Sequence, residues 1–129
     1  MLKSCGLILI LFGLLGGQTA MAAKCMLVMS YHQGYAWNDG VQQGVERVLA
    51  DKCALQIFYM DTKRHKHPEH ARAMALQAKQ FIDRYQPDVL IAADDAASRY
   101  LVKAYYQDAD LPVVFCAVNW DVSEYGYPY

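Results

Sequence analysis

Polar and aromatic side chains gather in four short stretches of the chain, at residues 30–38, 61–64, 94–98 and 119–121. Each stretch directly follows an apolar run of the kind that forms a strand buried in a parallel sheet. Ligands of open parallel sheets bind at the edge where the strands end. Because aromatic walls with a few placed polar groups suit a small organic molecule, the sequence predicts a small-molecule site at this edge.

The candidate ligand-binding residues all lie in these four stretches. They are Tyr31, His32, Tyr35, Trp37, Asp61, Asp94, Asp95, Ala96, Asn119 and Trp120. Structural roles remain open as alternatives, because the aromatic rings could cover the sheet end and Asp94 or Asp95 could cap a helix. The same helix start could hold an anionic group through its backbone N–H groups, or the two carboxylates could receive an amine.

Catalysis is disfavoured by the residue types at this edge. Ser30, Ser98 and Ser123 lack the G-x-S-x-G setting of a nucleophilic serine, and no glycine-rich phosphate loop follows the first apolar run. We therefore expect no catalytic residue, no cofactor and no enzymatic activity. An exported enzyme on a flavodoxin-like sheet would need catalytic residues that this sequence does not supply.

A histidine cluster, formed by His65, His67 and His70, could in principle bind a metal ion, since histidine is a common metal ligand. The cluster is interrupted by the cations Arg64 and Lys66, which repel a metal ion. We therefore interpret it as a solvated entry to a helix and expect no metal site.

The elements that must position the site follow from an alternation of apolar runs and helical stripes. Strands are expected at residues 25–31, 54–60, 88–93 and 113–118, and helices are expected to begin at residue 38 or 39, at residue 68, and at residue 94 or 95. Such alternation predicts an α/β fold with a doubly wound parallel sheet in the order 2-1-3-4, Rossmann-like or flavodoxin-like. The first helix is expected to bury Val48 and the third to bury Tyr105.

The N-terminal residues 1–22 have the pattern of a secretory signal peptide. Lys3 is followed by an apolar run of roughly ten residues, and Ala20 and Ala22 form a small-x-small exit. A transmembrane anchor would need about 20 apolar residues. We expect cleavage after Ala22, no direct membrane insertion afterwards, and a periplasmic or otherwise extracytoplasmic location.

The mature part, residues 23–129, is expected to form one small domain. Loss of Lys3 leaves 11 basic and 13 acidic residues, a net charge of −2, which argues against nucleic acid as a partner. Three cysteines remain. Cys25 and Cys53 would lie at the same end of neighbouring strands and are expected to form a disulfide, whereas Cys116 is expected to be a buried thiol.

Four blocks of the sequence, at residues 30–37, 59–64, 93–97 and 115–120, together resemble the ABC transporter substrate-binding proteins of the periplasmic binding protein type 1 fold. The resemblance is closer to the uncharacterised branch related to aromatic amino-acid binders. It implies two Rossmann-like lobes joined by a hinge, with the ligand held in the cleft between them. Residues 23–129 would then be a partial N-terminal lobe, so that the chain is expected to be a fragment.

The function that this resemblance implies is that of the periplasmic solute-binding component of an ABC importer. Its partners would be a small organic solute, an amino acid being one candidate, and an ABC permease in the membrane. The alternative is an extracytoplasmic ligand-sensing domain of a signalling protein, because the same fold also serves in sensors.

Overall fold

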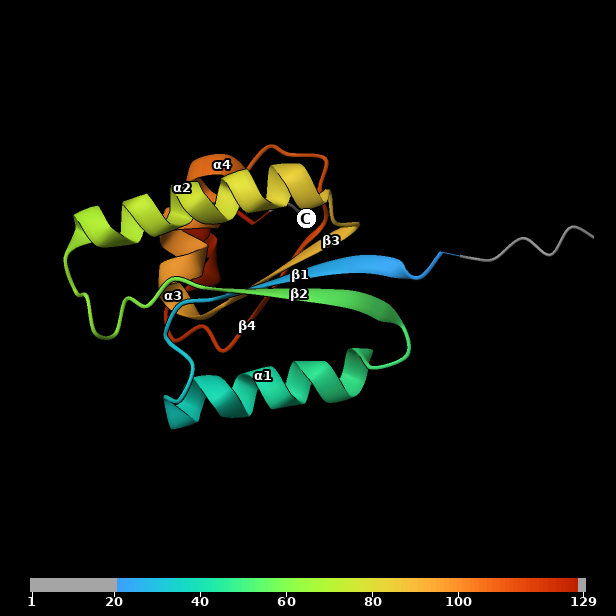
Figure 1. Cartoon of the computed structure of the whole chain (residues 1–129). Helices are drawn as coiled ribbons and strands as arrows, with labels where there is room; N and C mark the ends of the chain where they lie inside the picture. The colour runs from blue at the N-terminus through green and yellow to red at the C-terminus, as the bar shows by residue number, and fades with distance from the viewer. Residues whose placement is uncertain (1–20, 128–129) are drawn as a thin grey trace, which may run out of the picture.

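A computed structural model describes residues 21–127 (Figure 1). The predicted signal peptide lies outside the described residues except for its last two positions. Within residues 21–127, no helix is long and apolar enough to cross a membrane.

The centre of the molecule is a sheet of four parallel strands in the order β2-β1-β3-β4. The strands are β1 (Ala23–Met29), β2 (Cys53–Tyr59), β3 (Val89–Ala93) and β4 (Val113–Cys116). The predicted α/β class, parallel sheet and strand order are confirmed. The fourth strand ends two residues earlier than expected, because the backbone of Ala117 adopts a φ of 57° and leaves the extended conformation.

Helical segments connect the strands and pack on the sheet. They are α1 (Ala36–Leu49), α2 (Pro68–Tyr85), the continuous run of α3 (Asp94–Ala96), π-helix η1 (Ala97–Val102) and α4 (Lys103–Tyr105), and the 3-10 helix η2 (Val122–Tyr125). As predicted, α2 begins at Pro68, whose missing N–H costs nothing in the first turn. Figure 1 shows α1 on one face of the sheet and α2 with the α3–α4 run on the other, which makes three layers.

The strands alternate their side chains between two cores. Met26 and Val28 of β1 face α2 and η1, whereas Leu27 and Met29 face α1, and all four are fully buried. The sequence of β1 is therefore almost continuously apolar because this central parallel strand is buried on both faces, as expected.

Two local predictions were wrong, and one open alternative is not observed. Val48 is 64% exposed, because it lies at the open side of α1 where no second helix covers the sheet within residues 21–127. Tyr105 is 39% exposed and Tyr106 is buried in its place, since the π-helical turn of η1 shifts the buried positions by one residue. Neither Asp94 nor Asp95 caps the third helix with its side chain.

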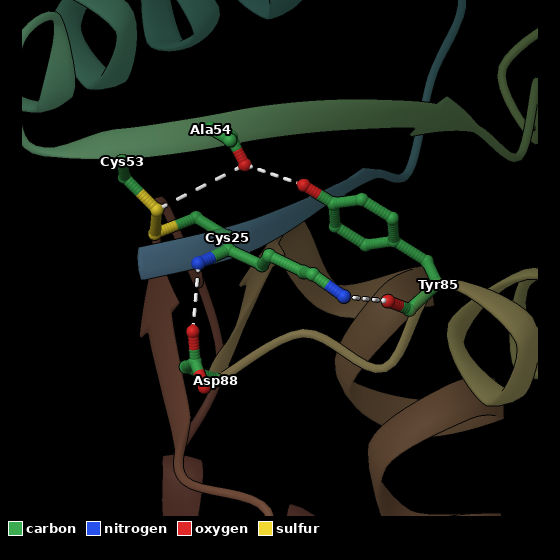
Figure 2. The surroundings of a disulfide bond; sticks show 6 residues. Cys25, Cys53, Ala54, Tyr85 and Asp88 are labelled. Carbon is green, nitrogen blue, oxygen red and sulfur yellow. Dashed lines mark hydrogen bonds between the residues drawn. A yellow bond between two sulfur atoms is a disulfide. The ribbon is translucent and has the colours of Figure 1, made fainter. Parts of the chain in front are cut away.

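The amino edge of the sheet is closed by covalent and polar contacts (Figure 2). Cys25 and Cys53 form a disulfide with their Cα atoms 5.8 Å apart, both projecting toward the α1 face. The Lys24 amide donates to Asp88 Oδ2 at 2.7 Å, and the Tyr85 hydroxyl donates to the Ala54 carbonyl at 2.6 Å. Cys116, expected to be buried, is only partly buried, and this partial burial raises the pKa of its thiol.

Candidate functional site

The carboxyl edge of the sheet, meaning the side on which the C-terminal ends of the parallel strands lie, carries unusual backbone geometry. Asp61, Asp94 and Ala117 each have a positive φ, of 53°, 67° and 57°, and each lies directly after β2, β3 or β4 or within two residues of its end. Positive φ is costly for residues other than glycine, and such strain concentrates where a fold positions functional groups. The edge that the sequence indicated as the site is therefore also the edge where the backbone departs from regular geometry.

A hollow of about 340 Å³ opens on this edge. Its lining residues are Tyr31, Thr62, Asp95, Ala96, Arg99, Tyr100, Asn119 and Trp120. Five of them belong to the predicted set, so the structure brings together residues from the ends of β1, β3 and β4. The Trp120 side chain is the most open of the aromatic groups, with 67% of its surface exposed.

Sequence reasoning missed Thr62, Arg99 and Tyr100 as lining residues. Arg99 follows Asp95 by four residues along a helical run, which places both on one helix face. That spacing was the available signal.

Asp95 organises the loop that follows β4. Its carboxylate accepts hydrogen bonds from the Asn119 amide and side chain at 3.2 and 3.1 Å, from the Trp120 amide at 3.3 Å and from the Tyr125 hydroxyl at 2.9 Å. Burial pushes the pKa of Asp95 upward, but these hydrogen bonds outweigh it and the pKa is lowered. Asp95 is thus an ionised anchor that holds Asn119 and Trp120 at the hollow.

Asp94 lies inside the molecule with no exposed surface. Its Oδ1 accepts a hydrogen bond from Trp37 Nε1 at 2.9 Å, whereas its buried Oδ2 has no partner among the described residues. Burial raises the pKa of this carboxyl, and the nearby charge of Asp95 raises it further. Trp37, which is half exposed, therefore links the start of α1 to the end of β3.

Asn38 is a second buried polar group at the start of α1, and the sequence analysis did not include it in the site. Its side chain is fully buried, and neither its amide nitrogen nor its oxygen has a partner among residues 21–127. Buried polar atoms are nearly always hydrogen-bonded in folded proteins, so Asn38 marks this region as unusual.

Asp61 connects the loops that follow β1 and β2. Arg64 donates to both of its carboxylate oxygens, and His32 and His65 lie 3.4 and 3.6 Å away. The hydrogen bond from Arg64 lowers the pKa of Asp61. Asp61 and His32, both predicted as ligand-binding residues, thus contact each other in the structure.

Tyr31 and Tyr35, in the loop that follows β1, form an aromatic pair at the carboxyl edge. The rings of Tyr31 and Tyr35 meet edge to face with centroids 5.5 Å apart. The Lys63 ammonium lies 5.4 Å from the first ring centroid and 5.0 Å from the second, within the range of a cation–π contact. These aromatic faces can therefore hold a cation, and the Lys63 ammonium already occupies them.

The serine hydroxyls near the site are used in structural contacts. Ser30 Oγ donates to the Ala93 carbonyl at 2.6 Å and accepts from the Ala97 amide at 2.8 Å, which joins β1 to the start of η1. Ser98 Oγ donates to the Asp94 carbonyl at 3.0 Å and also contacts the Tyr127 hydroxyl. These contacts hold the end of β1, the end of β3 and the start of η1 together at the carboxyl edge.

The histidine cluster is arranged for packing. The rings of His65 and His70 lie 4.6 Å apart, and His70 Nε2 is 2.8 Å from the Met60 carbonyl. In the part of the chain that the structure describes, no group of three or more potential ligands is arranged to hold a metal ion.

The fold and the site together define a parallel α/β domain with a polar, aromatic-walled hollow at the carboxyl edge of its strands. No protein-family model, curated protein or solved structure matches this chain. The geometry of the edge is therefore the observation from which a function is proposed.

Proposed function

We propose that this protein binds a small organic solute at the carboxyl edge of its sheet, as the periplasmic solute-binding component of an ABC importer. The observation that carries the proposal is the hollow between the ends of β1, β3 and β4, with the exposed Trp120 and the half-buried Tyr31 on its wall. Its volume of about 340 Å³ lies at the small end of the range for ligand sites, about 300–1,000 Å³.

The surroundings of the hollow also support binding. Asp95 fixes the loop carrying Asn119 and Trp120 through four hydrogen bonds, so that the backbone of both residues and the Asn119 side chain are held before a ligand arrives. Preorganisation of this kind improves affinity because less conformational entropy is lost on binding. In a two-lobed binding protein, this edge would face the second lobe.

The proposal is tested by thermal unfolding of the full chain in the presence of amino acids, nucleosides, sugars and short peptides. A solute that binds only the folded state raises the melting temperature with its concentration. We expect a rise with one chemical class, and we expect Trp120→Ala to abolish it. Tyr105→Ala, which removes an exposed aromatic side chain away from the hollow, is the matched control and should leave the rise intact.

Export is tested separately by the mass of the protein recovered from the periplasm. A chain beginning at Ala23 would support signal cleavage, and a chain retained in the cytoplasm with Lys3 present would contradict it. Solute binding without any association with a permease would favour the alternative role as an extracytoplasmic ligand-sensing domain.

A further inference from the structure

The acidic residues at the carboxyl edge are either engaged by groups of the protein itself or closed off from solvent. Asp94 is fully buried and bonded to Trp37, Asp95 accepts four hydrogen bonds, and Asp61 is bound by Arg64. A cationic solute would have to displace these internal donors or enter a closed site. None of the three carboxylates is therefore available to receive an amine.

Arg99 is the exposed cation of the hollow. It lies on η1, one helical turn after Asp95, and lines the hollow together with Tyr31 and Trp120. In the part of the chain that the structure describes, Arg99 forms no ion pair with a carboxylate, unlike Arg64 and Arg72, which do. Its guanidinium interacts with the Tyr125 hydroxyl, a neutral group, so it is the cation of the hollow that no carboxylate pairs with directly.

Lys63 adds a second positive charge on the same side. Its ammonium lies over the rings of Tyr31 and Tyr35, and Tyr31 is shared with the wall of the hollow. The faces of Tyr31 and Tyr35 are thus occupied by Lys63, whereas the exposed Trp120 ring stays open for the flat part of a solute. Both the available charge and the occupied aromatic faces favour a solute of negative charge.

We infer that the hollow binds an anionic solute, whose carboxylate or phosphate group is held by Arg99 and whose flat or apolar part lies against Trp120. This inference rests on the proposed solute-binding function and names the charge of the solute. A guanidinium presents a planar fork of donors that pairs with two oxygens of a carboxylate or phosphate at once. A protonated amine has no acceptor for these donors and carries the same charge.

The test uses probes that share an apolar group and differ in the charged or neutral group attached to it, measured by thermal unfolding of the full chain. Phenyl, indolyl and short alkyl groups are each offered as a carboxylate, a phosphate ester, an amine and a neutral alcohol. We expect the melting temperature to rise with carboxylate or phosphate forms alone, and the stronger of the two identifies the anionic group. We expect Arg99→Gln to weaken binding of that probe about 10- to 100-fold, since hydrogen bonds to charged groups are among the stronger ones.

Two further variants separate binding from folding. Arg72→Gln removes an exposed arginine of α2 that does not line the hollow and should leave the affinity unchanged. Arg99→Lys keeps the charge but loses the planar fork, and we expect an affinity between those of the wild type and Arg99→Gln. The melting temperature of each variant without a probe shows whether its fold is intact.

The outcomes are distinguishable. Stabilisation by amines or alcohols, unchanged in Arg99→Gln, would overturn the inference about charge while leaving solute binding in place. A screen in which no probe of any charge or any other solute raises the melting temperature would contradict the solute-binding proposal itself, and the inference would fall with it.

Discussion

The two edges of the same sheet are held together in different ways. At the amino edge, the Cys25–Cys53 disulfide and the hydrogen bonds of Lys24 and Tyr85 close the structure with satisfied contacts. At the carboxyl edge, Asn38 and Asp94 are buried with unpartnered polar atoms. The amino edge is thus closed by a covalent cross-link, whereas the carboxyl edge carries positive-φ residues and two buried side chains with unpartnered polar atoms.

The backbone shows the same division. Three of the four non-glycine residues with positive φ among residues 21–127 follow strands at the carboxyl edge, namely Asp61, Asp94 and Ala117, whereas the fourth, Gln86, ends a helix. A left-handed residue at the end of a helix is a common cap. At strand ends it redirects the chain, which places the following side chains over the hollow.

The largest expected effect tests the amino edge. The double variant Cys25→Ala/Cys53→Ala removes a cross-link across 28 residues, and chain entropy predicts a loss of about 3.5 kcal/mol in the free energy of unfolding. Urea unfolding measures it. Cys116→Ala is the control, since that thiol is unpaired and should cost much less. Equal losses in the two variants would show that the disulfide at the amino edge does not stabilise the fold as expected.

The next effect tests the anchor of the carboxyl edge. Asp95→Asn replaces one acceptor oxygen by an amide that faces the donors of Asn119, Trp120 and Tyr125. We expect a loss of about 1–2 kcal/mol and faster amide hydrogen exchange in residues 117–125. Asp108→Asn, an exposed aspartate after α4, is the control and should change neither quantity.

A third variant tests buried charge through pH. Because burial raises the pKa of Asp94, the folded protein binds its proton more tightly than the unfolded chain. The stability that this proton contributes is complete below the ordinary aspartate pKa and is lost as pH rises through the raised folded pKa. Asp94→Asn keeps an acceptor for Trp37 and should be less destabilised by rising pH than the wild type. The difference in stability between the two proteins, followed from pH 3 to 8, measures this.

That comparison isolates Asp94 from its neighbours. Asp61 and Asp95 have lowered pKa values, so their contribution is present above the ordinary aspartate pKa and is lost as pH falls through the lowered one. Both carboxylates are present in the wild type and in Asp94→Asn, and their effects cancel to first order. A difference that does not vary with pH would show that Asp94 does not titrate with a raised pKa.

The smallest effect tests backbone strain. Ala117→Gly should stabilise the protein by up to about 1 kcal/mol, because glycine adopts a φ of 57° without the penalty that a Cβ brings. Ala73→Gly, an exposed position inside α2, should instead destabilise by about 1 kcal/mol. Thermal unfolding measures both. Destabilisation of similar size at the two positions would mean that residue 117 carries no strain.

Much of the fold could be predicted from the sequence because its signals are local. The apolar run of β1 indicates a strand buried on both faces, and Pro68 indicates the start of α2. The strand order followed from the alternation of strands and helices, which restricts parallel sheets to few topologies. The bounds of β4 and the burial of Tyr105 could not be predicted, since a left-handed turn at Ala117 and a π-helix in η1 leave no periodic signal.

For the candidate site, too, one part could be predicted from the sequence and another part could not. The sequence by itself determined which edge of the sheet gathers polar and aromatic groups, because strand ends and chemistry are both visible in residue order. Only the tertiary structure decided which of those groups remain free: it turns Asp94 and Asp95 toward internal donors and leaves Arg99 and Trp120 at the hollow. Hydrogen bonds between residues 24 to 57 positions apart make that choice, and no local pattern records them.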